Sequence, residues 1–127
     1  MNKSLALKQI LLAAGIAMLP LAQAATLAKA DYSAEKTRIG AAYKADKTAC
    51  AALTANAKDI CVEEAQAKET VARAELEYAY TGNVKDQNKL LVAKAKSAYD
   101  VAKEKCDDFK GNEKDVCVKQ AKAVEIK

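Results

Sequence analysis

Apolar residues recur every three or four positions along this chain, which is the spacing that places them on one face of an α-helix. One such stripe consists of Leu91, Ala95, Ala98, Ala102, Cys106 and Phe109. An earlier stripe has the same spacing, with Asp46 interrupting it, and consists of Ile39, Ala42, Cys50 and Leu53. No segment alternates apolar and polar residues as a half-buried strand does. The pattern predicts an all-α fold.

Two interruptions of these stripes have the character of helix breaks. Gly111 suits the left-handed residue that closes a helix. Asn112 can then cap a new helix, with Asp115 three residues further on in a position like that of a capping box. Asn56 and Asp59 repeat this arrangement earlier in the chain, although an alanine precedes Asn56 where a glycine precedes Asn112. Each break predicts a helix-turn-helix.

The two helix-turn-helix segments are copies of one unit. Residues 42–67 and 98–123 align at an offset of 56 with eleven identities in 26 positions. The identities include both cysteine pairs, Asn56 with Asn112 and the Lys-Asp that follows. Internal repeats commonly reuse one supersecondary unit. We therefore expect one helical domain at residues 25–127 made of two repeats, about 30–80 and 86–127, separated by Thr81-Gly82-Asn83.

Each repeat contains two cysteines eleven residues apart. In an unbroken helix such residues lie about 16 Å apart along the axis, whereas a disulfide needs Cα atoms roughly 4.4–6.8 Å apart. The turn at each break favours local pairs, Cys50–Cys61 and Cys106–Cys117. The rival pairing of Cys50 with Cys117 and Cys61 with Cys106 stays open, because connectivity does not follow from sequence alone.

The first 24 residues have the organisation of a secretory signal peptide. Lys3 and Lys8 precede an apolar stretch at residues 10–21, and Ala22-Gln23-Ala24 offers a cleavage site after Ala24. That stretch is shorter than the roughly 20 residues of a membrane-spanning helix. We expect a periplasmic or secreted protein with no stable membrane insertion after cleavage; an uncleaved anchor is the alternative.

Composition and net charge limit the kinds of molecule that we expect this protein to bind. The signal holds two of the 21 basic residues and none of the 17 acidic ones, so a net charge of +2 remains of the overall +4. A charge so close to neutral argues against nucleic acid and anionic lipid as partners. Ala, Lys, Glu and Leu are good helix formers. The Ala-rich stripe between residues 65 and 79 leaves self-association open.

The residues for common enzyme chemistry are missing. The chain contains no His, so Ser-His and Cys-His nucleophiles cannot form. No glycine-rich phosphate loop is present. Adjacent carboxylates such as Glu63-Glu64 do not face each other on a helix. The sequence therefore predicts no enzyme, no cofactor and no metal site. An all-cysteine zinc site is the alternative use of the thiolates, but an exported protein favours disulfides.

The repeated Asn-x-Lys-Asp-(Ile/Val)-Cys-Val stretch, with a second Cys eleven residues before its own, resembles a family of short exported proteobacterial proteins. Members are Cys-paired, Ala/Lys/Glu-rich helical repeats, sometimes labelled TolA-like or linked to cell-envelope biogenesis. The resemblance implies an exported protein built from helical repeats. It assigns no catalytic or binding residue to this chain. It fits a non-enzymatic protein with an interaction, stress or chaperone-like role toward an unknown protein or envelope component. The alternative is a thiol-based redox or metal-handling protein that uses the four cysteines.

Overall fold

The computed structural model describes residues 27–125, which form four α-helices and one short 3-10 helix. The helices are α1 (Lys29–Cys50), α2 (Ala55–Thr81), α3 (Val84–Lys105) and α4 (Gly111–Glu125), with η1 (Cys106–Asp108) directly after α3. No strand occurs within this range. The predicted all-α fold of two tandem helix-turn-helix units is confirmed. The expected signal peptide, residues 1–24, lies outside the described residues.

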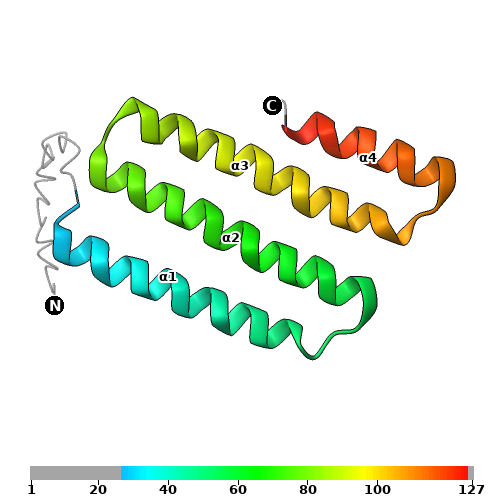
Figure 1. Cartoon of the computed structure of the whole chain (residues 1–127), viewed down its shortest axis with the longest axis horizontal. Helices are drawn as coiled ribbons and strands as arrows, with labels where there is room; N and C mark the ends of the chain where they lie inside the picture. The colour runs from blue at the N-terminus through cyan, green and yellow to red at the C-terminus, as the bar shows by residue number, and fades with distance from the viewer. Residues whose placement is uncertain (1–26, 126–127) are drawn as a thin grey trace, which may run out of the picture.

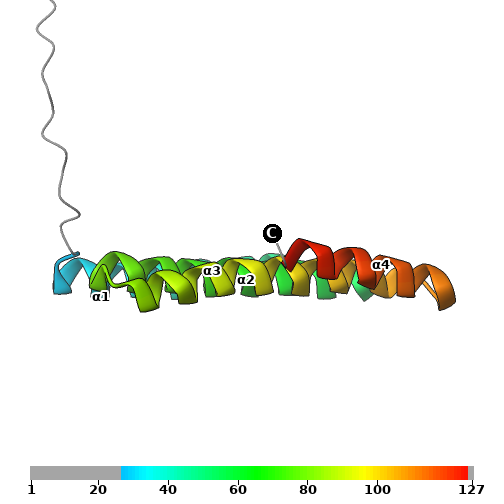
Figure 2. The same cartoon turned by 90° about the horizontal axis from the view of Figure 1, so that it is seen from above.

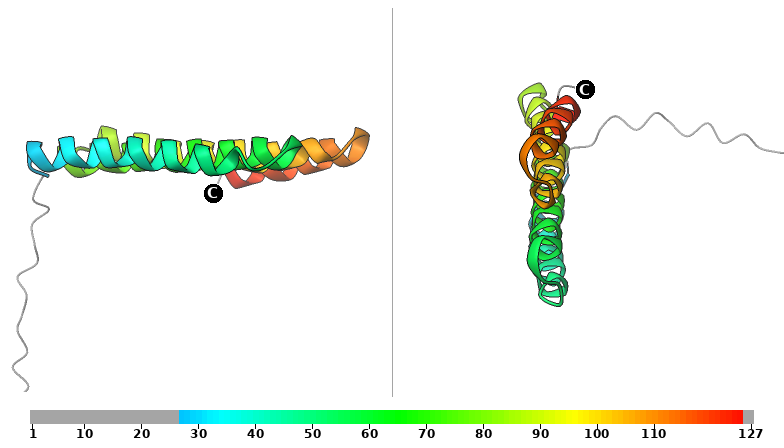
Figure 3. Two further views of the ribbon diagram at one scale, coloured as in Figure 1. Left: turned by 90° about the horizontal axis from the view of Figure 1, so that it is seen from below. Right: turned by 90° about the vertical axis from the view of Figure 1, so that its right-hand side faces the viewer.

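The helices lie side by side in chain order, each antiparallel to the one before it (Figure 1). Figures 2 and 3 show the molecule edge-on as a layer one helix thick. Helix α2 has α1 on one side and α3 on the other, and its contact with α3 is the most extensive in the molecule. The two repeats therefore pack together as one continuous layer, and none of the described helices covers either broad face of it.

A layer one helix thick confines the core to the lines where neighbouring helices meet. The buried apolar residues are Ile39, Cys50, Ala65, Leu76, Cys106 and Ala121. Two pairs among them, Cys50 with Cys106 and Ala65 with Ala121, are separated by the repeat offset of 56. The duplication seen in the sequence is therefore also a duplication of packing. Because alanine buries little area, this packing stabilises the layer only modestly.

The ends of the predicted apolar stripes are not buried. Leu91, Phe109 and Leu53 are 60, 46 and 42% exposed, respectively. Leu91 is exposed because α4 lies beside only the C-terminal half of α3 (Figure 1), whereas Phe109 lies in the turn before α4. Asp46, which interrupts the first stripe, pairs with Lys68 of α2 at 3.2 Å.

A compact polar network holds the turn between α2 and α3. Gly82 has a left-handed φ of 64° and donates its N–H to the Tyr78 carbonyl at 2.8 Å. Asn83 caps α3, since its Oδ1 accepts the Asp86 N–H at 2.8 Å. The Asp86 carboxylate in turn accepts bonds of 2.8 Å from Lys89, Thr81 and the Asn83 amide. This reciprocal pair resembles a capping box, but Asp86 accepts from the Asn83 side-chain amide, while the Asn83 backbone N–H donates to the Thr81 hydroxyl at 3.4 Å.

These donors make the turn sensitive to acid. The hydrogen bonds from Lys89, Thr81 and Asn83 lower the pKa of Asp86 from 3.8 to about 2. A lowered folded-state pKa stabilises the fold above pH 4, and that contribution is lost as the pH falls toward 2. We expect Asp86→Asn to lower the melting temperature at pH 7 and to match the unsubstituted protein at pH 2, as measured by circular dichroism.

The matched control is Asp59→Asn, which changes an exposed carboxylate on a different helix, α2. Surface substitutions of this kind usually have small effects, so this control should melt like the unsubstituted protein. A difference between Asp86→Asn and the unsubstituted protein that stays constant from pH 7 to pH 2 would contradict the account of the turn.

Candidate functional site

Each repeat closes on a disulfide-linked corner; we call residues 50–61 corner 1 and residues 106–117 corner 2. The disulfides join Cys50 to Cys61 and Cys106 to Cys117, with Cα atoms 5.6 and 5.7 Å apart. Cys50 and Cys106 are 1 and 0% exposed. The predicted local pairing is confirmed, and the rival pairing across the repeats is wrong.

The helix breaks differ in detail from the sequence expectation. Gly111 has the expected left-handed conformation, with φ 56°, and Ala55 adopts it as well, with φ 51°. The second helix of each repeat begins at these residues, so Asn56 and Asn112 lie inside α2 and α4. The N-cap position of α2 is Thr54, which makes no side-chain cap bond. The prediction that Asn56 and Asn112 are caps is therefore wrong.

This shift has a physical cause. The left-handed residue and the disulfide together reverse the chain, so each helix starts two residues earlier than an N-cap at Asn56 or Asn112 would allow. Asp59 and Asp115 consequently fall on the fifth residue of α2 and α4, too far along to complete a capping box. Asn56 bonds elsewhere, because its Nδ2 donates to the Glu104 carbonyl of α3 at 3.5 Å.

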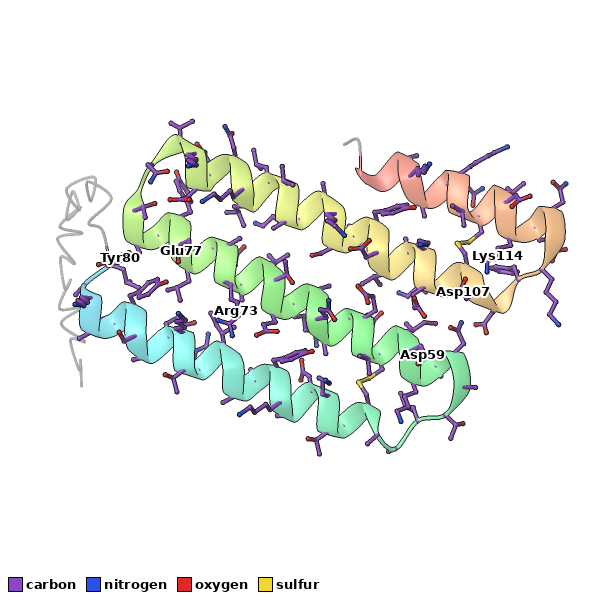
Figure 4. The ribbon with its side chains drawn as sticks, viewed as in Figure 1. Asp59, Arg73, Glu77, Tyr80, Asp107 and Lys114 are labelled. Carbon is purple, nitrogen blue, oxygen red and sulfur yellow. A yellow bond between two sulfur atoms is a disulfide. The ribbon has the colours of Figure 1, made fainter. Side chains whose placement is uncertain are left out.

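The two corners lie at the same end of the layer (Figure 4), where polar contacts also join α2 to α3. Besides the Asn56 bond, Lys105 of α3 pairs with Glu64 of α2 at 3.0 Å. Within corner 2, Lys114 pairs with Asp107 at 2.7 Å. That hydrogen bond raises the pKa of Lys114. The polar contacts between α2 and α3 thus help to join the two repeats at this end.

The four cysteines of the corners are all bonded to one another. No cysteine among the described residues is free. Over residues 27–125 no group of three or more His, Cys, Asp or Glu side chains could hold a metal ion. The sequence-predicted cysteines therefore shape the fold, and the candidate binding surface lies elsewhere on the layer.

A shallow apolar groove runs along one face between α2 and α3; we call it the α2–α3 groove. Its volume is about 390 Å³. Its lining is Ala67, Lys68, Val71, Lys94, Ser97, Ala98 and Val101. Lys94 reaches back across the helices to Glu75 at 2.8 Å. The groove therefore combines a largely aliphatic lining with two lysine side chains.

The groove between α1 and α2 is smaller and less accessible. Its volume is about 160 Å³, and Ile39, Ala42 and Tyr43 of α1 contribute to its lining. The Lys68–Asp46 ion pair bridges the two helices there. This groove is therefore the weaker candidate for binding.

The tyrosines at the other end of the layer contact one another. The Tyr32 and Tyr80 rings are 4.5 Å apart between centroids and tilted by 35°. The Tyr32 hydroxyl donates to Glu77 at 2.6 Å, and this bond raises the pKa of Tyr32. Figure 4 shows Tyr80, Glu77 and Arg73 on this part of α2. The contact between the two rings packs α1 against α2, so we interpret these tyrosines as packing residues.

Comparisons with family models, with curated proteins and with solved structures find no match to this chain. Within residues 27–125, no helix combines the length and apolar character that crossing a membrane requires.

The sequence pattern does not single out Val71 and Val101, which line the groove. Both valines fall outside the stripes chosen by period, because each of the central helices has a neighbour on two sides and carries two apolar stripes. The signal that could have found them is this second stripe, offset from the first by about half a turn.

Proposed function

We propose that this protein is a non-enzymatic interaction protein of the bacterial envelope that binds exposed apolar segments of a client or envelope protein. The observation that carries the proposal is the α2–α3 groove. None of the described helices forms a second layer over that face, so the aliphatic lining is open on the part of the chain that the structure describes. An apolar trough open to solvent gains free energy when a partner covers it.

The chemistry of the groove defines the partner. An open trough suits a segment of polypeptide better than a small molecule, since small-molecule sites enclose most of the ligand surface. Lys68 and Lys94 are already paired with Asp46 and Glu75, so the apolar lining rather than net charge defines the partner. The proposed client is therefore an unfolded or partly folded chain with exposed apolar side chains.

The compartment supports the same proposal. Two disulfides are compatible with an oxidising, extracytoplasmic environment, and the N-terminal sequence resembles a secretory signal. The resemblance to exported proteobacterial helical repeats points to the periplasm. A stress or chaperone-like role fits a protein whose helices are held by covalent corners while its faces remain available.

The test is site-specific photo-crosslinking in an export-competent host. A photo-reactive residue at Ala98, in the groove, is compared with one at Ala41, an exposed position on α1 outside it. We expect adducts with envelope or unfolded proteins from position 98 and far fewer from position 41. Ala98→Glu should weaken suppression of client aggregation in vitro, whereas the matched Ala41→Glu should not.

Equal crosslinking from both positions would show that the groove is not the binding surface. No adduct from either position, together with no effect on aggregation of an unfolded client, would remove the interaction proposal itself.

The thiol-based redox or metal-handling alternative is the weaker proposal, because all four cysteines are bonded and two of them are buried. It requires at least one readily reducible pair. Thiol labelling during titration with a reducing agent decides this, and a pair reduced at the potential of a catalytic dithiol would favour the alternative.

A further inference from the structure

An open trough lies beside the disulfide of corner 2; we call it the corner-2 trough. Its volume is about 390 Å³, and its lining is Phe109, Asn112, Glu113, Val116, Cys117 and Gln120. Phe109 and Val116 are 46 and 47% exposed, and Cys117 is half-buried. One cysteine of the second disulfide therefore reaches a surface that solvent enters, whereas its partner, Cys106, is 0% exposed.

The first repeat shows how the equivalent place at corner 1 is covered. At the repeat offset of 56, Asn112 and Gln120 of the trough correspond to Asn56 and Glu64. Both of these residues contact the C-terminal end of α3. Asn56 donates to a backbone carbonyl of α3 at 3.5 Å, and Glu64 pairs with a lysine of α3 at 3.0 Å. Helix α3 therefore packs on the part of repeat 1 that matches the corner-2 trough.

The burial of the matching residues differs accordingly. Three residues of repeat 1 that match trough residues are half-buried: Asn56, Ile60 and Glu64. Their counterparts in repeat 2 are all exposed: Asn112, Val116 and Gln120. Helix α4 is the last helix of residues 27–125 and forms one edge of the layer (Figure 1), so no described helix covers the matching side of it. The two disulfides have the same spacing in sequence, but they differ in access.

We propose that the Cys106–Cys117 disulfide is a site of thiol–disulfide exchange with a protein dithiol, and that the Cys117 sulfur is the one attacked. The attacking thiolate must reach one sulfur of the bond, and access is among the factors that set the rate of exchange. The corner-2 trough gives access at Cys117, whereas Cys106 is buried. This chain is the substrate of the exchange rather than its catalyst, so the proposal does not depend on client binding in the α2–α3 groove.

The exchange transfers two electrons to this chain. A thiolate of the protein dithiol attacks the Cys117 sulfur and forms a mixed disulfide, while the Cys106 sulfur leaves and takes up a proton. The second thiol of the dithiol then loses its proton, attacks its own partner sulfur in the mixed disulfide and releases Cys117, which is protonated in turn. The disulfide of this chain is thereby reduced to two thiols, and the dithiol is oxidised to a disulfide.

Reduction of this bond loosens α4. This helix has 15 residues and packs mainly against α3, whereas α2 has a helix on each side. The disulfide and one line of packing therefore hold α4 in place. Its release opens the side of α3 that it covers, next to Leu91 and Val92, which are 60 and 65% exposed already. The exchange thus converts a closed edge of the layer into an open apolar one.

The first test compares the two bonds in the oxidised mature protein. Thioredoxin, kept reduced by its NADPH-dependent reductase, serves as the protein dithiol. Free thiols are alkylated at successive times and located by mass spectrometry. We expect Cys106–Cys117 to open about tenfold faster than Cys50–Cys61, since the trough admits the attacking thiolate. Equal rates, or faster opening of Cys50–Cys61, would overturn the proposal.

The second test closes the trough. Val116→Trp places a large side chain in it from an exposed position and should slow the opening of Cys106–Cys117 severalfold. Val84→Trp is the matched control, because Val84 is 69% exposed at the other end of the layer, and its rate should not change. Neither substitution should alter the opening of Cys50–Cys61. An unchanged rate in Val116→Trp means that the thiolate approaches by another route, which overturns the role given to the trough.

The third test identifies the attacked sulfur. A thioredoxin that lacks the second cysteine of its dithiol stops the reaction at the mixed disulfide, which is trapped by acid at early times and mapped. We expect its attacking cysteine to be linked to Cys117. A link to Cys106 would overturn the assignment of the attacked sulfur, and a link mainly to Cys50 or Cys61 would overturn the choice of corner.

Discussion

Replacing Cys50 and Cys61 together by serine is expected to lower the free energy of unfolding by about 3 kcal/mol. In the chain-entropy model, that is the contribution of a disulfide that closes a loop of about a dozen residues. A small domain has roughly 5–15 kcal/mol of stability in all, and this layer has only a thin core. Removal of both disulfides should therefore leave the chain largely unfolded at 37 °C.

We expect the loss of each disulfide to affect a different part of the fold. Corner 2 holds α4, a helix of 15 residues whose helical neighbour is α3. Serine at Cys106 and Cys117 should therefore release α4 while α1, α2 and α3 persist. Hydrogen exchange measured by mass spectrometry follows each helix, with chemical denaturation giving the total. A fully reduced protein that melts at the same temperature as the oxidised one would contradict the role given to the corners.

The second large effect is expected at Ile39. This residue is 5% exposed, lies where α1 meets α2 and lines the groove there with Ala65 and Ala72. Its truncation to alanine leaves a cavity that alanine neighbours cannot fill, so we expect a loss of about 2–4 kcal/mol. Equilibrium denaturation in urea measures this loss.

Val116→Ala is the matched control for Ile39→Ala, because the same kind of side chain is removed from a surface position that is 47% exposed. Its cost should stay well under that of Ile39→Ala. Similar costs at the two positions would show that the line between α1 and α2 is not the core of this fold.

The helices and corners could be predicted from the sequence because they depend on local chemistry. A 3.6-residue period marks a helix over any window, and the reach of a disulfide is short. The spacing of Cys50 and Cys61, eleven residues apart, therefore required a turn between them. The left-handed residue at Gly111 followed from the freedom that glycine has at positive φ.

The single-layer arrangement could not be predicted in the same way. Alanine-rich helices such as α2 present similar apolar stripes on two sides, so the pattern does not say whether the neighbours share one side or lie on opposite sides. The Tyr32–Tyr80 pair joins residues far apart in the sequence, where no period connects them. The exact helix starts at Ala55 and Gly111 were missed because the disulfides, rather than Asn side chains, complete the turns.

The candidate binding site was even harder to predict from the sequence than the arrangement of the helices. The α2–α3 groove depends on which faces of two helices meet, and its aliphatic residues, Val71 and Val101, look like ordinary core positions. By contrast, the cap at Asn83 had a local signal, since an Asp follows it three residues later as a capping box requires.

The central claim is an exported layer of helices held by two local disulfides, and one measurement tests it most directly. A non-reducing peptide map, read by mass spectrometry, is made of the protein taken from an export-competent host. The account predicts a chain that begins at Ala25, with Cys50 linked to Cys61 and Cys106 linked to Cys117. Free thiols, bound metal or links between the repeats would contradict it.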